Sequence, residues 1–227
     1  MFSVIFEMHP KSDQWDAYLG YAKMLRPELE QIDGFVDNIR YKSLTRDGWA
    51  LSLSNWRDEK SVVRWRTHMR HHEVQELGRG EVLLDYHLRV DQLTQDTRLP
   101  AGYELNEQRL DETETGEGTA VTLIDAKWQA EWTETNNPAA CSQWLVLEPF
   151  ADGFIAWDVF DAVLTLGDLI LLVSWCDQAT ATAFEDTAAL PDGARLRRVR
   201  VVRDYGMFDW REAPQYYPEV DRPTSAS

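Results

Sequence analysis

The sequence contains only two cysteines, Cys141 and Cys176, among its 227 residues. Two cysteines do not make a disulfide framework, and free thiols are typical of a reducing compartment. The longest apolar stretch, residues 162–175, is too short to span a membrane and is interrupted by Asp168. The first residues lack the basic and apolar segments of a signal peptide. We therefore expect a cytoplasmic protein with no membrane partner.

Basic residues are also scarce: the chain has 23 Lys and Arg but 39 Asp and Glu, which gives a formal net charge of −16. A surface this acidic repels phosphate backbones, which argues against nucleic acid as a partner. The chain has no glycine-rich phosphate loop and no Gly-x-Ser-x-Gly turn. These absences argue against the common dehydrogenase, kinase and hydrolase classes.

The pattern of apolar residues in the first half predicts strands and helices in the order βαββαβ, the ferredoxin-like unit. A second helix capped by Asp58 and ended by Gly78 is part of this pattern. The second half repeats the first at an offset of 119, for example Trp56 with Trp175, and the repeat needs no gap from the first strand to the start of the second helix. The expected divisions are a first unit at 1–91, a linker at 92–118, a second unit at 119–205 and a tail at 206–227.

A four-stranded sheet with both helices on one side leaves its other face bare. Two such faces can bury each other, so the expected fold class is α+β: two ferredoxin-like units in tandem that form an intramolecular dimeric α+β barrel. The protein would then be a monomer with an internal pseudo-dimer, or a homodimer. The aromatic tail is expected to pack back over the barrel.

Three of the five histidines, His68, His71 and His72, cluster in the second helix. At 3.6 residues per turn, His72 falls on one stripe with Trp65, whereas His71 points the opposite way. We expect His72 to face inward, as a hydrogen-bonded core residue or as a base or ligand, and His71 to face solvent. His68 lies at the edge of the stripe, where it could contact a substrate. No third ligand accompanies His68 and His72, so no metal site is expected.

Polar residues alternate with apolar ones on the second and third strands. Asn38 and Arg40 share one face and either form a solvated surface or bind an oxygenated ligand. Asn55, beside Trp56, either caps the next helix or stabilises an oxyanion. All five histidines lie in the first unit, so the active site is expected there.

The Asp33-Gly-Phe turn, the hairpin that ends at Trp56 and the His-rich helix with Trp65 resemble the antibiotic biosynthesis monooxygenase family. The resemblance is good over residues 2–90 and reaches 120–205 only through the repeat. It implies the dimeric α+β barrel fold and, for some members, oxidation of phenols or quinols by dioxygen without a cofactor. The expected function is therefore a cofactor-independent monooxygenase that acts on a small aromatic substrate.

In this interpretation His72 is the base, Asn55 or Arg40 is the oxyanion partner and Trp65 is a wall of the pocket. The resemblance also leaves a haem-binding or haem-degrading protein open, with His71 or His72 as the iron ligand. Haem-degrading relatives place their ligand about ten residues after the tryptophan, where this chain has Gln75. A non-catalytic barrel that binds a small molecule is the third alternative.

Overall fold

The computed structural model describes residues 1–106, 116–128, 138–145 and 153–208, so most of the expected tail lies outside the described residues. The first unit consists of β1 (Phe2–Pro10), α1 (Trp15–Leu29), β2 (Phe35–Ser43), β3 (Ala50–Trp56), α2 (Glu59–Arg66), α3 (Met69–Leu77), the π-helical turn η1 (Gly78–Val82) and β4 (Leu83–Asp96). The second consists of β5 (Ala120–Lys127), α4 (Pro138–Trp144), β6 (Phe154–Ala162), β7 (Asp168–Trp175), α5 (Gln178–Thr187) and β8 (Arg195–Gly206).

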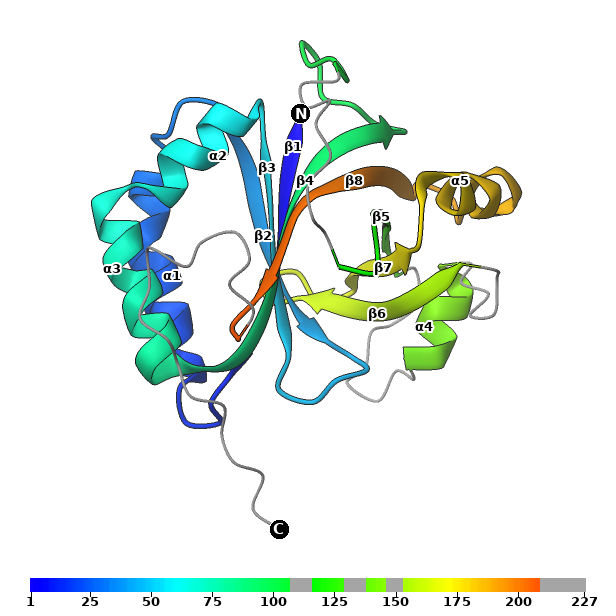
Figure 1. Cartoon of the computed structure of the whole chain (residues 1–227). Helices are drawn as coiled ribbons and strands as arrows, with labels where there is room; N and C mark the ends of the chain where they lie inside the picture. The colour runs from blue at the N-terminus through cyan, green and yellow to red at the C-terminus, as the bar shows by residue number, and fades with distance from the viewer. Residues whose placement is uncertain (107–115, 129–137, 146–152, 209–227) are drawn as a thin grey trace.

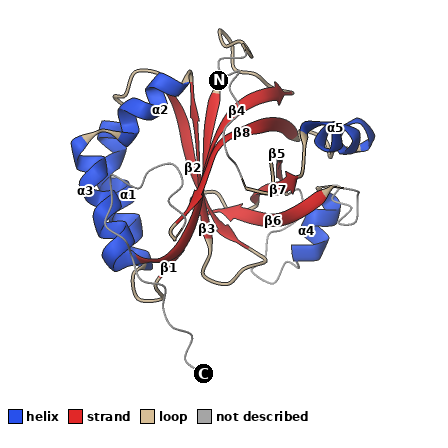
Figure 2. Cartoon of the chain, viewed as in Figure 1, coloured by secondary structure: helices blue, strands red, loops and turns tan. Residues whose placement is uncertain are grey.

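The eight strands close into one barrel in the order β1-β3-β2-β6-β7-β5-β8-β4. The two units join where β2 pairs with β6 and where β4 pairs with β8. Helices α1, α2 and α3 cover one side of the barrel, and α4 and α5 lie on the other (Figure 1, Figure 2). The tandem α+β barrel predicted from the repeat is confirmed. β4 continues to Asp96, past the expected end of the first unit at residue 91.

The duplication is visible in strand pairing and in helix capping. Asp58 and Asp177 each accept a hydrogen bond from the backbone N–H three residues later. The offset is 119 from Leu53 to Leu172, but it is 118 between their partners Ile5 and Leu123. The expectation of a repeat without a gap from the first strand to the start of the second helix is therefore wrong by one residue, at the first strand.

Alternation along each strand divides the apolar residues into an interior set and an outer set. Ile5, Leu53, Leu123 and Leu172 are among the buried residues of the barrel interior. Phe2 and Trp56, on the opposite face, pack beneath the helices of the first unit together with Trp65. No helix among the described residues is long and apolar enough to cross a membrane.

Candidate active site

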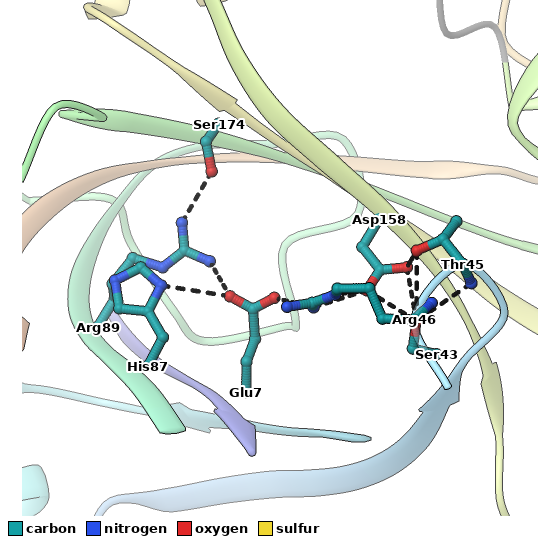
Figure 3. A network of polar contacts seen from close by, with 8 residues as sticks. All are labelled: Glu7, Ser43, Thr45, Arg46, His87, Arg89, Asp158 and Ser174. Atoms are coloured by element: carbon teal, nitrogen blue, oxygen red, sulfur yellow. Dashed lines mark hydrogen bonds and ion pairs between the residues drawn. The ribbon is translucent and has the colours of Figure 1, made fainter. Parts of the chain in front are cut away.

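A large cavity of about 570 Å³ opens at one end of the barrel interior. Its charged groups bind one another (Figure 3). Glu7 binds Arg46 at 2.6 Å and Arg89 at 2.8 Å, and Arg46 also binds Asp158 at 2.6 Å. Burial alone would raise the pKa of Glu7, but Arg89, His87 and Arg46 together lower it to about 2. The charges of Glu7, Arg46, Arg89 and Asp158 are thus already paired within the cavity.

A smaller cavity, about 190 Å³, lies between the outer face of the first unit's sheet and helices α1 and α3. An apolar cavity of about 150 Å³ is large enough for benzene, so this space suits one substituted ring. Its lining is mostly apolar and aromatic with a few polar groups, the usual character of a small-molecule site. The lining residues are Val4, Phe6, Tyr18, Tyr21, Ala22, Leu25, Leu29, Asn38, Arg40, Ser52, Ser54, Trp65, His71, Val74, Gln75 and Leu88.

Three residues predicted from the sequence, Asn38, Arg40 and Trp65, therefore lie around one cavity. The amide nitrogen of Asn38 donates to the Ser52 hydroxyl at 2.9 Å and to the Leu53 carbonyl at 3.2 Å. These bonds lock the Asn38 side chain to β3. Arg40, two residues on along the same face of β2, brings a positive charge to the lining.

His71 is the histidine that reaches this cavity. Its ring stacks on Trp65 with centroids 4.2 Å apart and an interplanar angle of 18°. Nδ1 lies 2.9 Å from the Trp65 carbonyl oxygen, which can only accept, so Nδ1 carries the proton and Nε2 has a free lone pair. Burial lowers the pKa of His71 to about 4, which keeps the ring neutral at pH 7.

The orientation expected for the cluster is therefore wrong: His71 faces inward, and His72 lies at the surface with a 38% exposed side chain. The cause is a break in the predicted second helix. His68 has an extended backbone (φ −64°, ψ 124°) between α2 and α3, and the break resets the helical phase. A continuous helix would also place Met69 on the stripe of Trp65 and His72, but its side chain is 77% exposed for the same reason.

Three other predicted site residues lie outside the cavity lining. His72 Nε2 is 3.5 Å from Glu76, and His68 Nδ1 is 3.6 Å from Glu28. Asn55 faces the barrel interior, where it accepts from the Ser3 hydroxyl at 2.8 Å. Asn55 is on the opposite face of β3 from Ser52 and Ser54, so the structure does not bring it together with Trp65. Within the described residues no group of His, Cys, Asp and Glu is arranged to hold a metal ion.

Sequence reasoning missed the contributions of α1 and β3. Tyr18, Tyr21 and Leu25 follow helical spacing, and all three line the cavity. Ser52 and Ser54 alternate with leucines in β3 and complete its polar side. The period-2 serines are a signal that could have been matched to Asn38 and Arg40 on the adjacent strand.

The second unit has apolar side chains at the two positions that match Asn38 and Arg40. At the offset of 119, Arg40 corresponds to Val159 and Asn38 to Trp157. Val159 is fully buried, and Trp157 packs against the same core cluster. The polar lining thus belongs to the first unit, where the histidine distribution predicts the active site.

Comparison with known proteins shows the family of the chain. The model of the family described as antibiotic biosynthesis monooxygenase matches residues 1–77, the part of the chain that contains β1 to α3. A protein of Pyricularia oryzae named jasmonate monooxygenase ABM is 48% identical over 221 residues, which cover 96% of this chain and 99% of that protein. The chain belongs to the antibiotic biosynthesis monooxygenase family. It is accordingly an oxidoreductase of the monooxygenase type.

Solved structures resemble this family member only distantly. A protein described as anthrone oxidase-like is 12% identical with a TM-score of 0.33, covering 91% of this chain and 93% of its own. A monooxygenase-like protein of Lactobacillus acidophilus is 7% identical with a TM-score of 0.39, covering 91% and 96%. Both likenesses are too weak to add to the assignment.

Proposed function

We propose that the chain oxygenates a small carbocyclic substrate in the 190 Å³ cavity, using dioxygen and no cofactor. The observation that carries this proposal is the His71 ring in the cavity lining with its Nδ1 held by the Trp65 carbonyl, an arrangement that leaves Nε2 as the proton acceptor. A base fixed against an aromatic wall in a mostly apolar cavity is what deprotonation of a weak carbon or oxygen acid needs. Phe6, Leu25 and Leu88 supply the apolar surroundings.

In the proposed reaction a methylene group and one dioxygen become a carbonyl group and one water. The substrate supplies all four electrons that reduce dioxygen, so no external reductant is needed. His71 Nε2 takes a proton from the substrate, and the resulting anion gives one electron to dioxygen. The substrate radical and superoxide combine into a C–O bond, and the proton on His71 returns to the outer peroxide oxygen. Loss of the second C–H proton breaks the O–O bond and leaves the carbonyl and water.

The low pKa of His71 sets a condition on the substrate. A group with a pKa of about 4 is neutral and available, but it holds a proton weakly. An anion formed beside it favours the imidazolium and raises the pKa of His71 during the reaction. Effective proton transfer therefore depends on close contact between His71 Nε2 and the substrate atom that loses the proton.

Jasmonate is the first substrate to test, because the Pyricularia oryzae protein named jasmonate monooxygenase ABM matches this chain over nearly its whole length. Jasmonate is a substituted cyclopentanone, and hydrogens beside its ketone are acidic. Phenol-like and quinol-like rings are the second candidate. The stack of Trp65 and His71, with Tyr18 and Tyr21 close by, favours a flat ring.

Haem fits these residues poorly. His71 lines a cavity of about 190 Å³, below the roughly 300–1,000 Å³ usual for larger ligands. His72 lies beside Glu76 at the surface, outside the cavity lining. We therefore propose neither histidine as an iron ligand.

Oxygen uptake by the purified full chain tests the function. Jasmonic acid is assayed first, followed by hydroquinones and anthrones, each with and without NADPH. His71→Gln should lower turnover by about 10²–10⁴-fold, the usual contribution of a positioned base, whereas His72→Gln should change it less than about twofold. Unchanged turnover in His71→Gln would exclude it as the base. Uptake that requires NADPH would refute the cofactor-free reaction.

A further inference from the structure

Arg40 brings a positive charge into the cavity, and no carboxylate among the described residues balances it. Within that part of the chain, none of the acidic side chains forms an ion pair with its guanidinium. Its Nε is buried and lacks a hydrogen-bond partner there. The guanidinium lies beside Tyr18, where burial raises the pKa of the phenol and Arg40 partly offsets that rise. A neutral phenol oxygen does not compensate a full positive charge.

An unbalanced arginine stands out in this chain, which has 39 acidic and 23 basic residues. Several other arginines of the barrel strands and their loops have a carboxylate partner. A buried charge is costly unless it is paired, so carboxylates gather around such groups. The paired arginines include Arg46 and Arg89 with Glu7, Arg195 with Asp96, Arg197 with Asp125 and Arg198 with Glu185, at 2.6–3.1 Å.

The described residues that line the rest of the cavity include no acidic side chain. Asn38 and the serines are neutral, and the ring of His71 is neutral at pH 7 because of its low pKa. The cavity therefore combines one cation with an aromatic and aliphatic wall. A ligand that matches it has an apolar ring and a single negative charge.

We propose that Arg40 is the binding site for the carboxylate of a ring monocarboxylic acid, which is thereby the substrate class of this enzyme. The inference rests on the proposed function for the identity of the cavity. A guanidinium binds a carboxylate through two parallel N–H···O bonds, which fix orientation as well as charge. Arg40 would thus position the ring against Trp65 and His71 without touching the reacting carbon.

The test compares binding of each acid with binding of its neutral methyl ester. Isothermal titration uses the full chain with jasmonic acid, phenylacetic acid and cinnamic acid and their three esters at pH 7. The wild type should bind at least one acid about 10- to 100-fold more tightly than its ester, the usual worth of a charge-assisted pair. In Arg40→Gln the affinity for that acid should fall to that of the ester, and ester affinity should stay the same.

Two further variants separate charge recognition from loss of structure. Arg40→Lys keeps the charge without the two-pronged geometry and should retain part of the preference. Arg26→Gln removes the same charge from an exposed site on α1, where Arg26 pairs with Glu30, and should leave the preference intact. Equal wild-type affinity for every acid and its ester overturns the assignment, as does a parallel loss of acid and ester in Arg40→Gln.

Binding and turnover are read separately, so the two proposals fail in different ways. If an acid binds in an Arg40-dependent way but causes no oxygen uptake, the carboxylate site is supported and the proposed oxygenation is refuted. Oxygen uptake that is equal for acid and ester, and unchanged in Arg40→Gln, supports the oxygenation and refutes the carboxylate site.

Discussion

Asp91 on β4 provides a direct test of the polar interior of the barrel. Its side chain is fully buried, and neither carboxyl oxygen has a hydrogen-bond partner among the described residues. Burial raises the pKa of Asp91 to about 8, although Arg89 works against the rise. The same carboxyl in an unfolded chain has a pKa of about 3.9. Between these two values the folded protein holds a proton that the unfolded chain releases.

This difference makes the protein less stable as pH rises. Above pH 3.9 or so the Asp91 carboxyl ionises in the unfolded chain but stays protonated in the folded protein, so rising pH favours unfolding. The effect levels off near pH 8, where the folded carboxyl ionises as well. One such group changes the free energy of unfolding by about 1.4 kcal/mol per pH unit. From pH 5.5 to pH 7.5 the contribution of Asp91 is a loss of about 2.5 kcal/mol.

Urea unfolding of the wild type and Asp91→Asn at both pH values measures this loss. Asparagine cannot ionise, and Asp91 is mostly protonated across the window, so neighbouring charges experience the same field in both proteins. Any packing effect of the amide is the same at both pH values and cancels. From pH 5.5 to pH 7.5 the free energy of unfolding of the wild type should fall by about 2.5 kcal/mol more than that of the variant. Equal pH dependence in the two proteins would refute the reasoning.

Two more predictions follow from the first unit and its repeat. The His71 ring should titrate near pH 4 by NMR because it is buried against Trp65, and a value near the ordinary 6.5 or so would contradict that burial. Asp58→Ala and Asp177→Ala each remove a helix cap and should each lower the free energy of unfolding by about 1 kcal/mol in urea. A negligible loss at either position would show that the cap contributes nothing there.

Much of the fold could be predicted from the sequence because its signals are local. Strand alternation, the helix cap at Asp58 and the Asp33-Gly-Phe turn depend on neighbours a few residues apart. The bare sheet face of each unit then required a partner, and the duplicated chain supplies it. Local signals also identified Asn38, Arg40 and Trp65 as candidate residues, and the structure places all three around one cavity.

The choice of histidine depended on the tertiary structure. A continuous helix turns 100° per residue, so a single extended residue at His68 is enough to exchange the directions of His71 and His72. Asn55 faces the barrel interior because its position in β3 differs by one residue from that of Ser54. That Arg40 lacks a carboxylate partner among the described residues also follows only from the packing of α1 and α3 over β2. The sequence by itself determined the repeat and the residue types, and long-range packing decided which of them meet.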